Sequence, residues 1–579
     1  MFVFSSSFSV FFFTIILGLA WRHREPHLYP DVILGVIAKS LWLSWLIVNI
    51  SYYTTFGEYL NFFIILIVVF ISINLFLKNY PSCYIFKKRK YISFLAALLV
   101  IGLFMLSASY TDYYSLIFQR WDTVVSWNRW ATEISENTFH PMNAAYPVFF
   151  PGLWSLVYEV QSDNSIWIMA KSIMLIFPII LMVTIYSLLL REKLLSVFLL
   201  IIVINIIFFS GNFYYLTSGY MDYPVAAMIL VSMILLYLSS VDDDSSNNER
   251  ANELLLFSIV FASLAAITKQ AGILSFVPIV YYMASKYIDK TILVEKLAFY
   301  LFVLIFPIIM FLIMFFLEED NIFGNADVLK KLVVSKTTDS NVYLNAFNIM
   351  HQKFPMPLTF SLIAFSMLNI FNLKKITGQL GMLLFIMSAI GFFIFADCCS
   401  YDQRNGIWIF SFLVVSVLFG LFEFDNLTKV GLGGCVSIHA KYLVGFILVF
   451  SFSVSILFGV NVSEKSIRNL QYNEQIKIGS EGINNLLLRH RDKLGPNGVI
   501  VSFYQLTGWL PGMKNKYKLC YGHKDACVLN TLDTLPGSLV LVGKGRRDYP
   551  GARKYFTKDK FLGRYGVYEL YGPFNEGRG

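Results

Sequence analysis

Three charged residues, distant along the chain, have the side-chain types that a group transfer from phosphate requires. Asp122 follows a tryptophan and precedes apolar sequence, so its carboxylate is partly desolvated and suited to accept a proton from a hydroxyl. Lys269 and Arg404 are cations near the ends of apolar stretches, where a charge usually has a function or a partner. We therefore expect Asp122 to act as a general base and the two cations to belong to a site. A structural ion pair is the alternative reading of each cation.

Four further residues complete the candidate site. Arg129 is a further candidate cation, and Asp222 would either orient an acceptor or hold Lys269 in place. Tyr146 and Tyr220 could contact the acceptor or stack on a sugar ring. We expect no metal centre, because the cysteines and histidines do not show metal-ligand spacing.

The composition indicates an integral membrane protein that must position these residues. The chain has 579 residues, of which 57% are hydrophobic and only 14% charged, about half the charged share of a soluble protein. About fourteen stretches are long and apolar enough to cross a bilayer. We expect these spans near residues 4–21, 31–53, 57–77, 91–110, 165–190, 194–210, 223–240, 253–268, 271–286, 297–316, 357–372, 380–396, 407–423 and 442–461.

The loop charges predict which ends of these spans share a side. Basic residues fall on every second connection, which makes that side cytoplasmic. The short loops on the other side are almost free of Lys and Arg, and Lys269 and Arg404 are the conspicuous exceptions. The net charge of +9 is therefore read as an orientation signal, and no nucleic-acid partner is expected.

The polar stretch from Gln119 to Trp154 lies on the outer side in this topology. From Asp122 onward, polar residues recur at helical spacing while Trp127 and Trp130 take other sides, which predicts an amphipathic helix lying in the membrane interface. Most of the tryptophans are then interface anchors. The following apolar piece, residues 148–160, is too short to cross and should lie along the surface or dip in and return.

Four polar segments on the predicted outer side occur in a recognisable order. They are Trp121-Asp122 with Tyr146-Pro147, then "GYMDYP" at 219–224, then "TKQAG" at 268–272, then "SYDQRNG" at 400–406. Together they resemble the GT-C superfamily of glycosyltransferases that use polyprenyl-phosphate sugars, in particular the bacterial relatives of the protein-mannosyltransferase and aminoarabinose-transferase group. The resemblance covers roughly residues 91–460.

The resemblance implies a fold and an activity. It implies a helical polytopic GT-C domain over residues 1–461, with outer loops at 110–165 and 317–357. It also implies transfer of a sugar from a polyprenyl-phosphate donor to a glycan, lipid or protein hydroxyl, with inversion, in the modification of the cell envelope. In such a transfer Lys269 and Arg404, with Arg129 as a second candidate, would bind the donor phosphate and stabilise the charge that grows on it. The active site would face the periplasm from a bacterial inner membrane. No cofactor is expected, although the departures at Gln270-Ala271 and the single aspartate in the first loop leave metal dependence open.

After residue 461 the composition turns polar and predicts a separate outer domain, residues 462–579. Strands are expected at 498–503, 538–544 and 566–572, and a helix at 480–491, which together make a small α/β domain. Cys520 and Cys527 are disulfide candidates if this domain faces an oxidising compartment. The domain would either cap the catalytic cavity or recognise the acceptor.

Two other functions compete with the glycosyltransferase. A diphosphate-linked glycan ligase or oligosaccharyltransferase would share the outer site but need a larger acceptor groove or a metal. A lipid or glycan transporter should show paired repeats and charges at mid-membrane, whereas here the notable charges gather at one predicted face.

Overall fold

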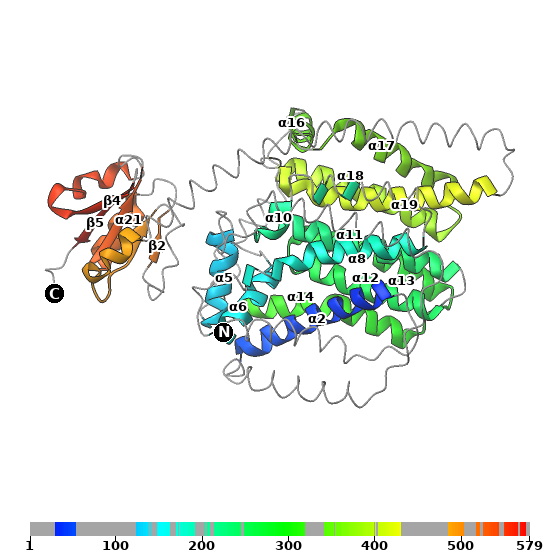
Figure 1. Ribbon diagram of the computed structural model, residues 1–579, viewed down its shortest axis with the longest axis horizontal. Coiled ribbons are helices and arrows are strands. Elements are labelled where there is room, and N and C mark those ends of the chain that lie inside the picture. The colour runs from blue at the N-terminus through cyan, green and yellow to red at the C-terminus, as the bar shows by residue number, and fades with distance from the viewer. Residues whose placement is uncertain are drawn as a thin grey trace. The chain divides into compact units, whose positions relative to one another are not determined.

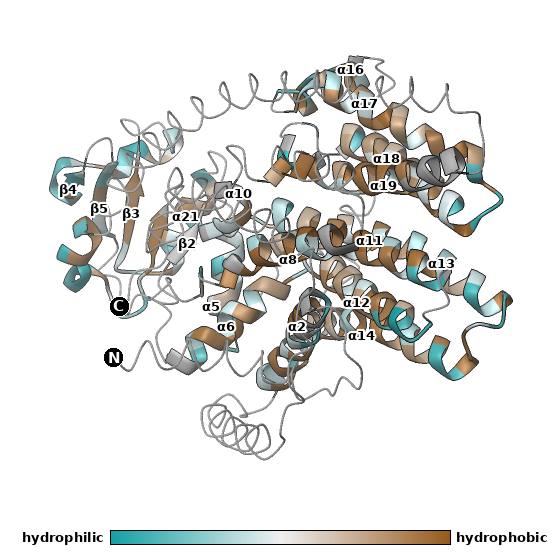
Figure 2. Ribbon diagram, turned by 45° about the vertical axis from the view of Figure 1, so that its right-hand side comes forward, coloured by the Kyte–Doolittle hydropathy of each residue, from teal (hydrophilic) through white to brown (hydrophobic). Residues whose placement is uncertain are grey.

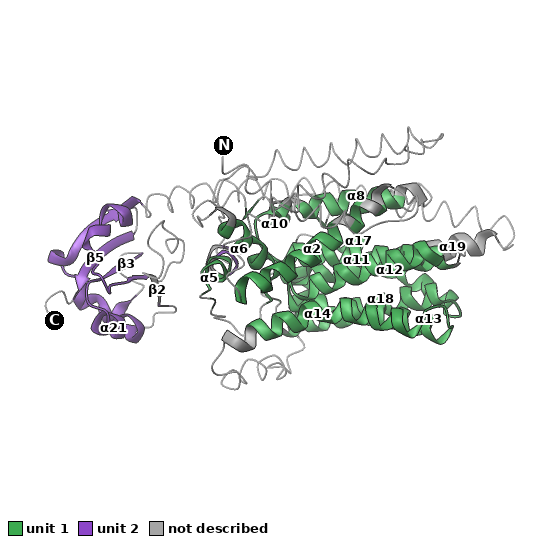
Figure 3. Ribbon diagram, turned by 90° about the horizontal axis from the view of Figure 1, so that it is seen from below, with its two compact units in different colours: residues 1–115, 130–162, 168–466 green, residues 116–129, 163–167, 467–579 purple. Residues whose placement is uncertain are grey.

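The computed structural model is mostly helical and carries a small carboxyl-terminal sheet (Figure 1). It divides into two compact units, which Figure 3 colours separately. Unit 1 comprises residues 1–115, 130–162 and 168–466, and unit 2 comprises residues 116–129, 163–167 and 467–579. The residues that the structure describes are 29–53, 123–137, 139, 147–161, 170–171, 173–191, 203–204, 207–208, 213–244, 248–318, 341–352, 354–398, 400, 403–429, 485–502, 517–520, 525–543, 549–565 and 568–574.

Unit 1 is a helical bundle. The helical elements up to residue 429 include several 3-10 segments and the π-helical η2, which is grouped with unit 2, as is the first residue of α5. In chain order they are α2 (Tyr29–Tyr53), η2 (Thr123–Asn128), α5 (Arg129–Ser135), α6 (Phe149–Gln161), η3 (Ile173–Leu175), α8 (Ile176–Arg191), α10 (Phe213–Thr217), α11 (Asp222–Asp244), α12 (Asn248–Ala266), η5 (Gln270–Ser275), α13 (Phe276–Ile288), α14 (Val294–Glu318), α16 (Asn341–Met350), α17 (Met356–Ser366), η7 (Met367–Asn372), α18 (Ile376–Cys398), η8 (Gln403–Gly406) and α19 (Ile407–Lys429).

Six of the described helical stretches are long and apolar enough to cross a membrane. They are Ile33–Tyr53, Asp222–Asp243, Gln270–Ile288, Val294–Met314, Ile376–Asp397 and Arg404–Leu421. Each falls on a span expected from the sequence, so the helical membrane class holds for this part of the chain. Two further expected spans are shorter apolar helices, Ile176–Leu188 and Met356–Asn372. The expected spans at 4–21, 57–77, 91–110 and 442–461 lie outside the described residues, as does most of 194–210.

The spans differ in the share of their residues that is buried within the protein, and this share distinguishes the inner helices from the outer ones. Within the apolar stretch of α11, 94% is buried, against 33% for α14 and 39% for η5–α13. The helices of unit 1 are hydrophobic along most of their length (Figure 2). The exposed apolar faces of α13, α14 and α18 are therefore the surfaces that would meet lipid.

Buried serines bring the inner helices close together. The Ser232 hydroxyl of α11 donates to the Ser258 carbonyl of α12 at 2.7 Å, and the Ser258 hydroxyl donates back to the Ser232 carbonyl at 2.8 Å. Nearer the start of α11, the Ser411 hydroxyl of α19 donates to the Ala226 carbonyl at 2.8 Å. Small side chains that also bond across the contact are typical of helix packing in membranes.

A proline in α14 is matched by a tryptophan in α2. Pro307 has no N–H, so the Val303 carbonyl one turn earlier cannot receive the usual helical hydrogen bond. The Trp42 indole N–H of α2 donates to that carbonyl at 3.2 Å, and the ring stacks on Phe306 at 5.6 Å between centroids. The first described helix thus satisfies a backbone group that the proline leaves open far along the chain.

One end of the bundle is held by ion pairs, and we call it the Arg250 end. Arg250 of α12 pairs with Asp31 of α2 at 2.9 Å and with Asp242 of α11 at 3.4 Å. Lys286 of α13 pairs with Asp243 of α11 at 2.7 Å, and the Ser187 hydroxyl of α8 donates to Asp31 at 2.6 Å. Five helices whose termini were expected on one side of the membrane are therefore joined by buried or half-buried charges.

The structure corrects the reading of the first outer loop. The amphipathic stretch is helical, as a π-helical turn followed by α5, but Trp127 and Trp130 are only 6% and 3% exposed. Trp154 on α6 is fully buried. The prediction of interface anchoring is wrong for these three indoles, which pack inside protein. The piece at 148–160 is likewise apolar because it is buried: Gly152 of α6 lies against Val48 of α2 so closely that an added Cβ would be 2.7 Å from a valine methyl.

The second long outer loop is partly helical. Residues 317–357 were expected to form a long loop, yet α14 extends to Glu318 and α16 occupies Asn341–Met350. His351 joins α16 to the next helix, since its ring nitrogens lie 2.7 Å from the Phe347 carbonyl and 2.9 Å from the Thr359 hydroxyl of α17. Residues 319–340 lie outside the described residues.

Unit 2 contains a five-stranded sheet in the order β2-β1-β3-β5-β4. The strands are β1 (Ile500–Ser502), β2 (Tyr517–Leu519), β3 (Ser538–Val542), β4 (Phe561–Tyr565) and β5 (Tyr568–Phe574), and the other elements are η9 (Arg491–Lys493), α21 (Asp525–Thr534), η11 (Pro550–Tyr555) and η12 (Lys558–Lys560). β1 pairs in parallel with β2 and β3, while β5 pairs antiparallel with β3 and β4. The expected strands correspond to β1, β3 and β5, whereas β2, β4 and α21 were missed.

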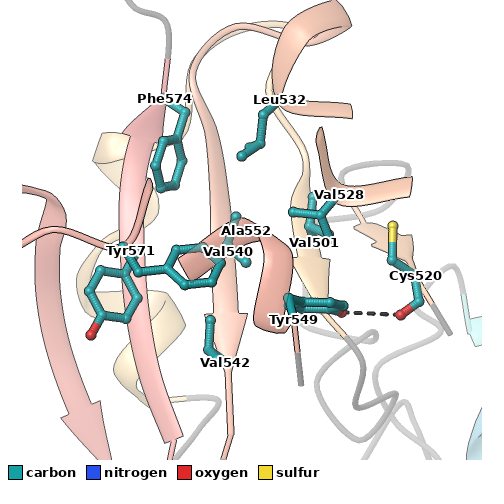
Figure 4. Packing of buried hydrophobic residues seen from close by; sticks show 11 residues of the cluster. Val501, Cys520, Val528, Leu532, Val540, Val542, Tyr549, Ala552, Tyr571 and Phe574 are labelled. Atoms are coloured by element: carbon teal, nitrogen blue, oxygen red, sulfur yellow. Dashed lines mark hydrogen bonds between the residues drawn. The ribbon is translucent and has the colours of Figure 1, made fainter. Parts of the chain in front are cut away.

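Each face of this sheet has its own apolar core. One core gathers Val540 and Tyr571 of the sheet with Val528 of α21 and with Phe556 (Figure 4). Within it the Tyr549 hydroxyl donates to the Cys520 carbonyl at 3.2 Å. The other core places Leu539 and Leu541 against Leu487, in a helical segment at 485–489. The sheet is thus covered on both sides, and a disulfide joins Cys520, the residue after β2, to Cys527 of α21.

Candidate functional site

The turn that carries Lys269 has a fixed backbone. It leaves α12 through Thr268, whose N–H and that of Lys269 both donate to the Ala265 carbonyl at 3.1 Å. The Gly272 N–H then donates to the Lys269 carbonyl at 2.9 Å as η5 begins. A Cβ on Gly272 would lie 2.2 Å from the Ala265 carbonyl carbon, closer than side chains approach, so only glycine permits this turn. The point from which the Lys269 side chain leaves the backbone is therefore set by local geometry.

Asp222 meets Lys269 from the start of α11. Gly219 has a φ of 92°, a left-handed conformation that glycine adopts readily, and this turn brings the chain to Asp222 as the first helical residue. The positive end of a helix dipole favours a carboxylate there. The Lys269 ammonium donates to the Asp222 carboxylate in an ion pair whose side chains are 17% and 8% exposed. Of the two roles expected for Asp222, the geometry shows the contact with Lys269.

The third motif reaches the same place through η8. The Asn405 side-chain oxygen lies 3.4 Å from the Lys269 ammonium, and the adjacent Arg404 guanidinium lies 4.1 Å from the centre of the Tyr220 ring. The Trp408 indole N–H donates to the Asn405 carbonyl at 2.7 Å and so ties η8 to α19. Asp222, Lys269, Arg404, Asn405 and Tyr220 form one group, which we call the Lys269 cluster.

An aromatic stack supports the arginine of this cluster. Tyr220 is 7% exposed and lies 5.9 Å from the Tyr215 ring of α10, which in turn stacks on Tyr223 at 5.4 Å and 13°. A guanidinium over such a ring gains about 0.5–2 kcal/mol, more when it is desolvated. Tyr220 was expected to contact an acceptor, but here its face carries Arg404.

The second half of the first outer loop reaches the same end of the bundle. The Phe149 N–H at the start of α6 donates to the Ile267 carbonyl at 3.1 Å, two residues before Lys269. Further along α6, Glu159 accepts a 2.6 Å hydrogen bond from Ser51, near the end of α2 opposite Asp31. Burial raises the pKa of Glu159 to about 7, and the hydrogen bond from Ser51 opposes that rise. A carboxyl group that titrates near neutrality therefore lies toward the Lys269 cluster end of α2.

The two ends of α11 show that this cluster and the Arg250 end are far apart. Asp222 begins the helix and Asp243 lies on its last turn, a separation of about 30 Å at 1.5 Å per residue. Figure 1 shows the same polarity, with α10 and α13 toward opposite ends of the bundle. Unit 1 thus has one charged group at each end of its most buried span.

The remaining predicted residues are placed only in part. Asp122 and Tyr146 lie outside the described residues. Arg129 is the first residue of α5, its side chain is not among those described, and it is grouped with unit 2. The structure therefore brings together Asp222, Lys269, Arg404 and Tyr220, while the roles of Asp122, Tyr146 and Arg129 stay predictions.

Two residues near the cluster escaped the sequence reasoning. Asn405 directly follows Arg404 in "SYDQRNG" and could have been included as part of that motif. Glu159 lies near the end of an apolar stretch, and no local sequence pattern marks it as functional. Its environment depends on its contact with Ser51 of α2, which is distant in the sequence. Among the described residues, no group of three or more His, Cys, Asp or Glu side chains is placed to hold a metal ion.

The cluster offers positive charge with a fixed direction. An ammonium can donate three hydrogen bonds and a guanidinium five, so an anion beside Lys269 and Arg404 would receive charge-assisted bonds from both.

Comparison with protein-family models, with characterised proteins and with solved structures finds no match to this chain.

Proposed function

We propose that the protein is a membrane glycosyltransferase that moves a sugar from a polyprenyl-phosphate donor to an acceptor hydroxyl at the outer face. One observation carries the proposal: Asp222, Lys269 and Arg404, from three separate motifs, meet at one end of a bundle of span-length apolar helices. A phosphate held at a membrane surface by a lipid tail requires cations at that depth. The cluster supplies two of them beside a carboxylate.

In the proposed reaction, Asp122 accepts the proton of the acceptor hydroxyl as its oxygen attacks the anomeric carbon. The bond between that carbon and the phosphate oxygen breaks, and its electron pair remains on the lipid phosphate. Lys269 and Arg404 stabilise the charge that develops there. A single displacement of this kind inverts the anomeric centre.

Asp222 has a supporting part in this scheme. Its bond to Lys269 keeps the ammonium pointed toward η8 rather than toward solvent. Because both side chains are mostly buried, the cost of desolvating them offsets much of their mutual attraction. A phosphate can therefore share Lys269 at little cost, while the aspartate still limits where the side chain goes.

The surface next to the cluster suits a donor with a lipid tail. η5 and α13 begin immediately after Lys269, and Ile273, Val277 and Val280 along them are 43–48% exposed. These apolar side chains run from the cationic turn along the face expected to meet lipid. A soluble nucleotide sugar would have no use for such a path.

The test is turnover of the donor by the purified full chain in nanodiscs. A panel of polyprenyl-phosphate sugars is supplied with envelope acceptors, and donor loss is followed for the wild type and Asp122→Asn. We expect one donor to be consumed by the wild type and turnover to fall by about 10³ in the variant. The matched control is Glu136→Gln, from the same loop, which should turn over normally.

Other outcomes separate the competing functions. Consumption only of diphosphate-linked glycans would indicate the ligase instead. Movement of intact lipid-linked sugar between leaflets without cleavage would indicate a transporter. Turnover by Asp122→Asn at the wild-type rate would remove the base assignment but leave the role of the cations open to separate measurement.

A further inference from the structure

The chain's charge is distributed unevenly between its two parts. Residues 462–579 contain 19 Lys and Arg and 10 Asp and Glu, so they carry a net charge of +9, the whole formal charge of the protein. In the remaining 461 residues the opposite charges balance. The net positive charge was read above as a product of the short loops. It belongs instead to the carboxyl-terminal segment, where it calls for a separate explanation.

Part of this charge lies on one continuous segment, which we call the basic segment, residues 553–564. It reads "RKYFTKDKFLGR", with five cations and one anion. The basic segment comprises the last residues of η11, all of η12 and most of the edge strand β4. Arg553, Lys554, Lys558 and Arg564 are exposed, as are the aromatic side chains Tyr555 at 41% and Phe561 at 42%.

The basic segment is held in place from beneath. Ala552 and Phe556 are at most 1% exposed and belong to the apolar core under η11. The Asp525 carboxylate of α21 accepts bonds from the N–H groups of Gly551 at 2.9 Å and Ala552 at 3.3 Å. The exposed cations therefore project from a fixed backbone. Charges on an edge strand also prevent strand pairing, but that function would not require the exposed tyrosine and phenylalanine.

We infer that the basic segment binds the anionic headgroup surface of the membrane. Lys and Arg interleaved with exposed aromatic rings are what an anionic bilayer interface attracts, the cations to phosphate and the rings to headgroup depth. The segment belongs to a chain with span-length apolar helices, so a bilayer is always within tether range and its effective concentration is high. The inference stands independently of the proposed glycosyl transfer.

The experiment uses the full chain in nanodiscs that contain a trace of photoactivatable phosphatidylglycerol. After illumination, the yield of lipid crosslinked to residues 550–565 is measured by mass spectrometry. The triple variant Arg553→Gln/Lys554→Gln/Lys558→Gln should reduce the yield at least fivefold, since one cation near an anionic surface changes binding about fivefold at low salt. Replacing Tyr555 and Phe561 by serine should reduce it about twofold to fivefold.

The matched control removes the same charge elsewhere on unit 2. Arg489→Gln/Arg491→Gln/Lys493→Gln neutralises three exposed cations of the segment that covers the other face of the sheet, and its crosslink yield should stay within twofold of wild type. Equal loss in both triple variants would show a nonspecific charge effect and overturn the inference. Undiminished labelling in the first triple variant would overturn it as well.

A rival partner is an anionic glycan. Titration of heparin into wild-type nanodiscs made of phosphatidylcholine alone, followed by hydrogen exchange of residues 550–565, tests that alternative. Protection by micromolar heparin at physiological salt, with no lipid crosslinking in the anionic discs, would assign the segment to a glycan and overturn the lipid assignment. Lipid crosslinking that declines as salt rises supports it.

Discussion

The charged groups at the two termini of α11 contain similar side chains but are arranged differently. At the Arg250 end, Asp31, Asp242 and Asp243 face Arg250 and Lys286, so three carboxylates join two cations and every ion pair connects a different set of helices. In the Lys269 cluster, Lys269 pairs with Asp222, and Arg404 lies over the ring of Tyr220. The ion pairs of the first arrangement fasten helices to one another. The second arrangement holds an ammonium and a guanidinium at one place, and in the proposed function these two cations bind the donor phosphate.

The largest expected difference concerns Lys269, in the turn after α12, and Lys286, on α13. Lys269→Met should lower turnover by about 10²–10³, the usual effect of removing one charge-stabilising donor, and should also cost about 3 kcal/mol of stability, because it removes the ammonium that pairs with the mostly buried Asp222 carboxylate. Lys286→Met should cost a similar amount of stability, because it removes the ammonium 2.7 Å from Asp243, but it should leave turnover per folded molecule unchanged. Donor turnover and thermal unfolding in the same nanodiscs measure both.

The double variant Lys286→Met/Asp243→Asn checks the second half of that prediction. It removes both charges, so it should recover much of the lost stability. If Lys269→Met and Lys286→Met have the same turnover per folded molecule, the two ends do not differ in the way described.

A second contrast compares two glycines that lie against their neighbours. In Gly272→Ala the new Cβ would meet the backbone carbonyl of Ala265, which cannot yield, so the Lys269 turn must shift and turnover should fall about 100-fold. In Gly35→Ala, near Asp31, the new Cβ would lie 2.3 Å from the Phe257 ring, a side chain that can move. We expect that variant to lose about 1–3 kcal/mol of stability and to keep its turnover once folded. Turnover per folded molecule measures both effects.

A third prediction isolates the ring beneath Arg404. Tyr220→Leu should lower turnover about 3- to 30-fold, because the guanidinium loses a contact of about 0.5–2 kcal/mol. Tyr220→Phe keeps the ring face beneath Arg404. It should therefore leave the KM for the donor unchanged and retain most of the activity. A loss in Tyr220→Phe as large as in Tyr220→Leu would point to the hydroxyl, and hence to the acceptor contact expected from the sequence.

The smallest effect is a pH dependence of stability at the Ser51–Glu159 contact. Because burial raises the pKa of Glu159 from 4.5 to about 7, the folded protein keeps this proton to a higher pH than the unfolded chain. The resulting stabilisation is complete below about 4.5 and is lost as the pH rises through about 7. Glu159→Gln should flatten the slope of melting temperature against pH between these values. An unchanged slope in Glu159→Gln would contradict this assignment.

Hydropathy was a good guide to the helices and a poor one to their surroundings. Six predicted spans coincide with apolar helices, because length and apolar content are local properties. A tryptophan buried in protein and one at a lipid interface look alike in sequence, so Trp127, Trp130 and Trp154 were misread. In unit 2, β3 was recognised as a buried apolar run, whereas β2 holds only "YKL" and β4 contains a glycine, so neither gives a strand pattern.

The cluster could be predicted in part for a related reason. Lys269 and Arg404 stood out because they break the loop-charge rule, and Asp222 because it opens a span. No local pattern could show that Arg404 would rest on Tyr220, since that contact depends on how η8 and α11 pack. Gly219 and Gly272 belong to the motifs identified in the sequence. The structural need for glycine at these positions, a left-handed backbone at Gly219 and a close approach to Ala265 at Gly272, is visible only in the structure.

The bond from Trp42 to the Val303 carbonyl bears on the order in which the protein is made. Trp42 is synthesised 261 residues before Val303, the residue whose carbonyl it binds. When α14 leaves the insertion machinery, it carries a backbone oxygen that hydrocarbon cannot solvate. The face of α2 that carries Trp42 must therefore remain accessible until α14 is inserted. The two helices can then pack together without leaving the Val303 carbonyl exposed to lipid.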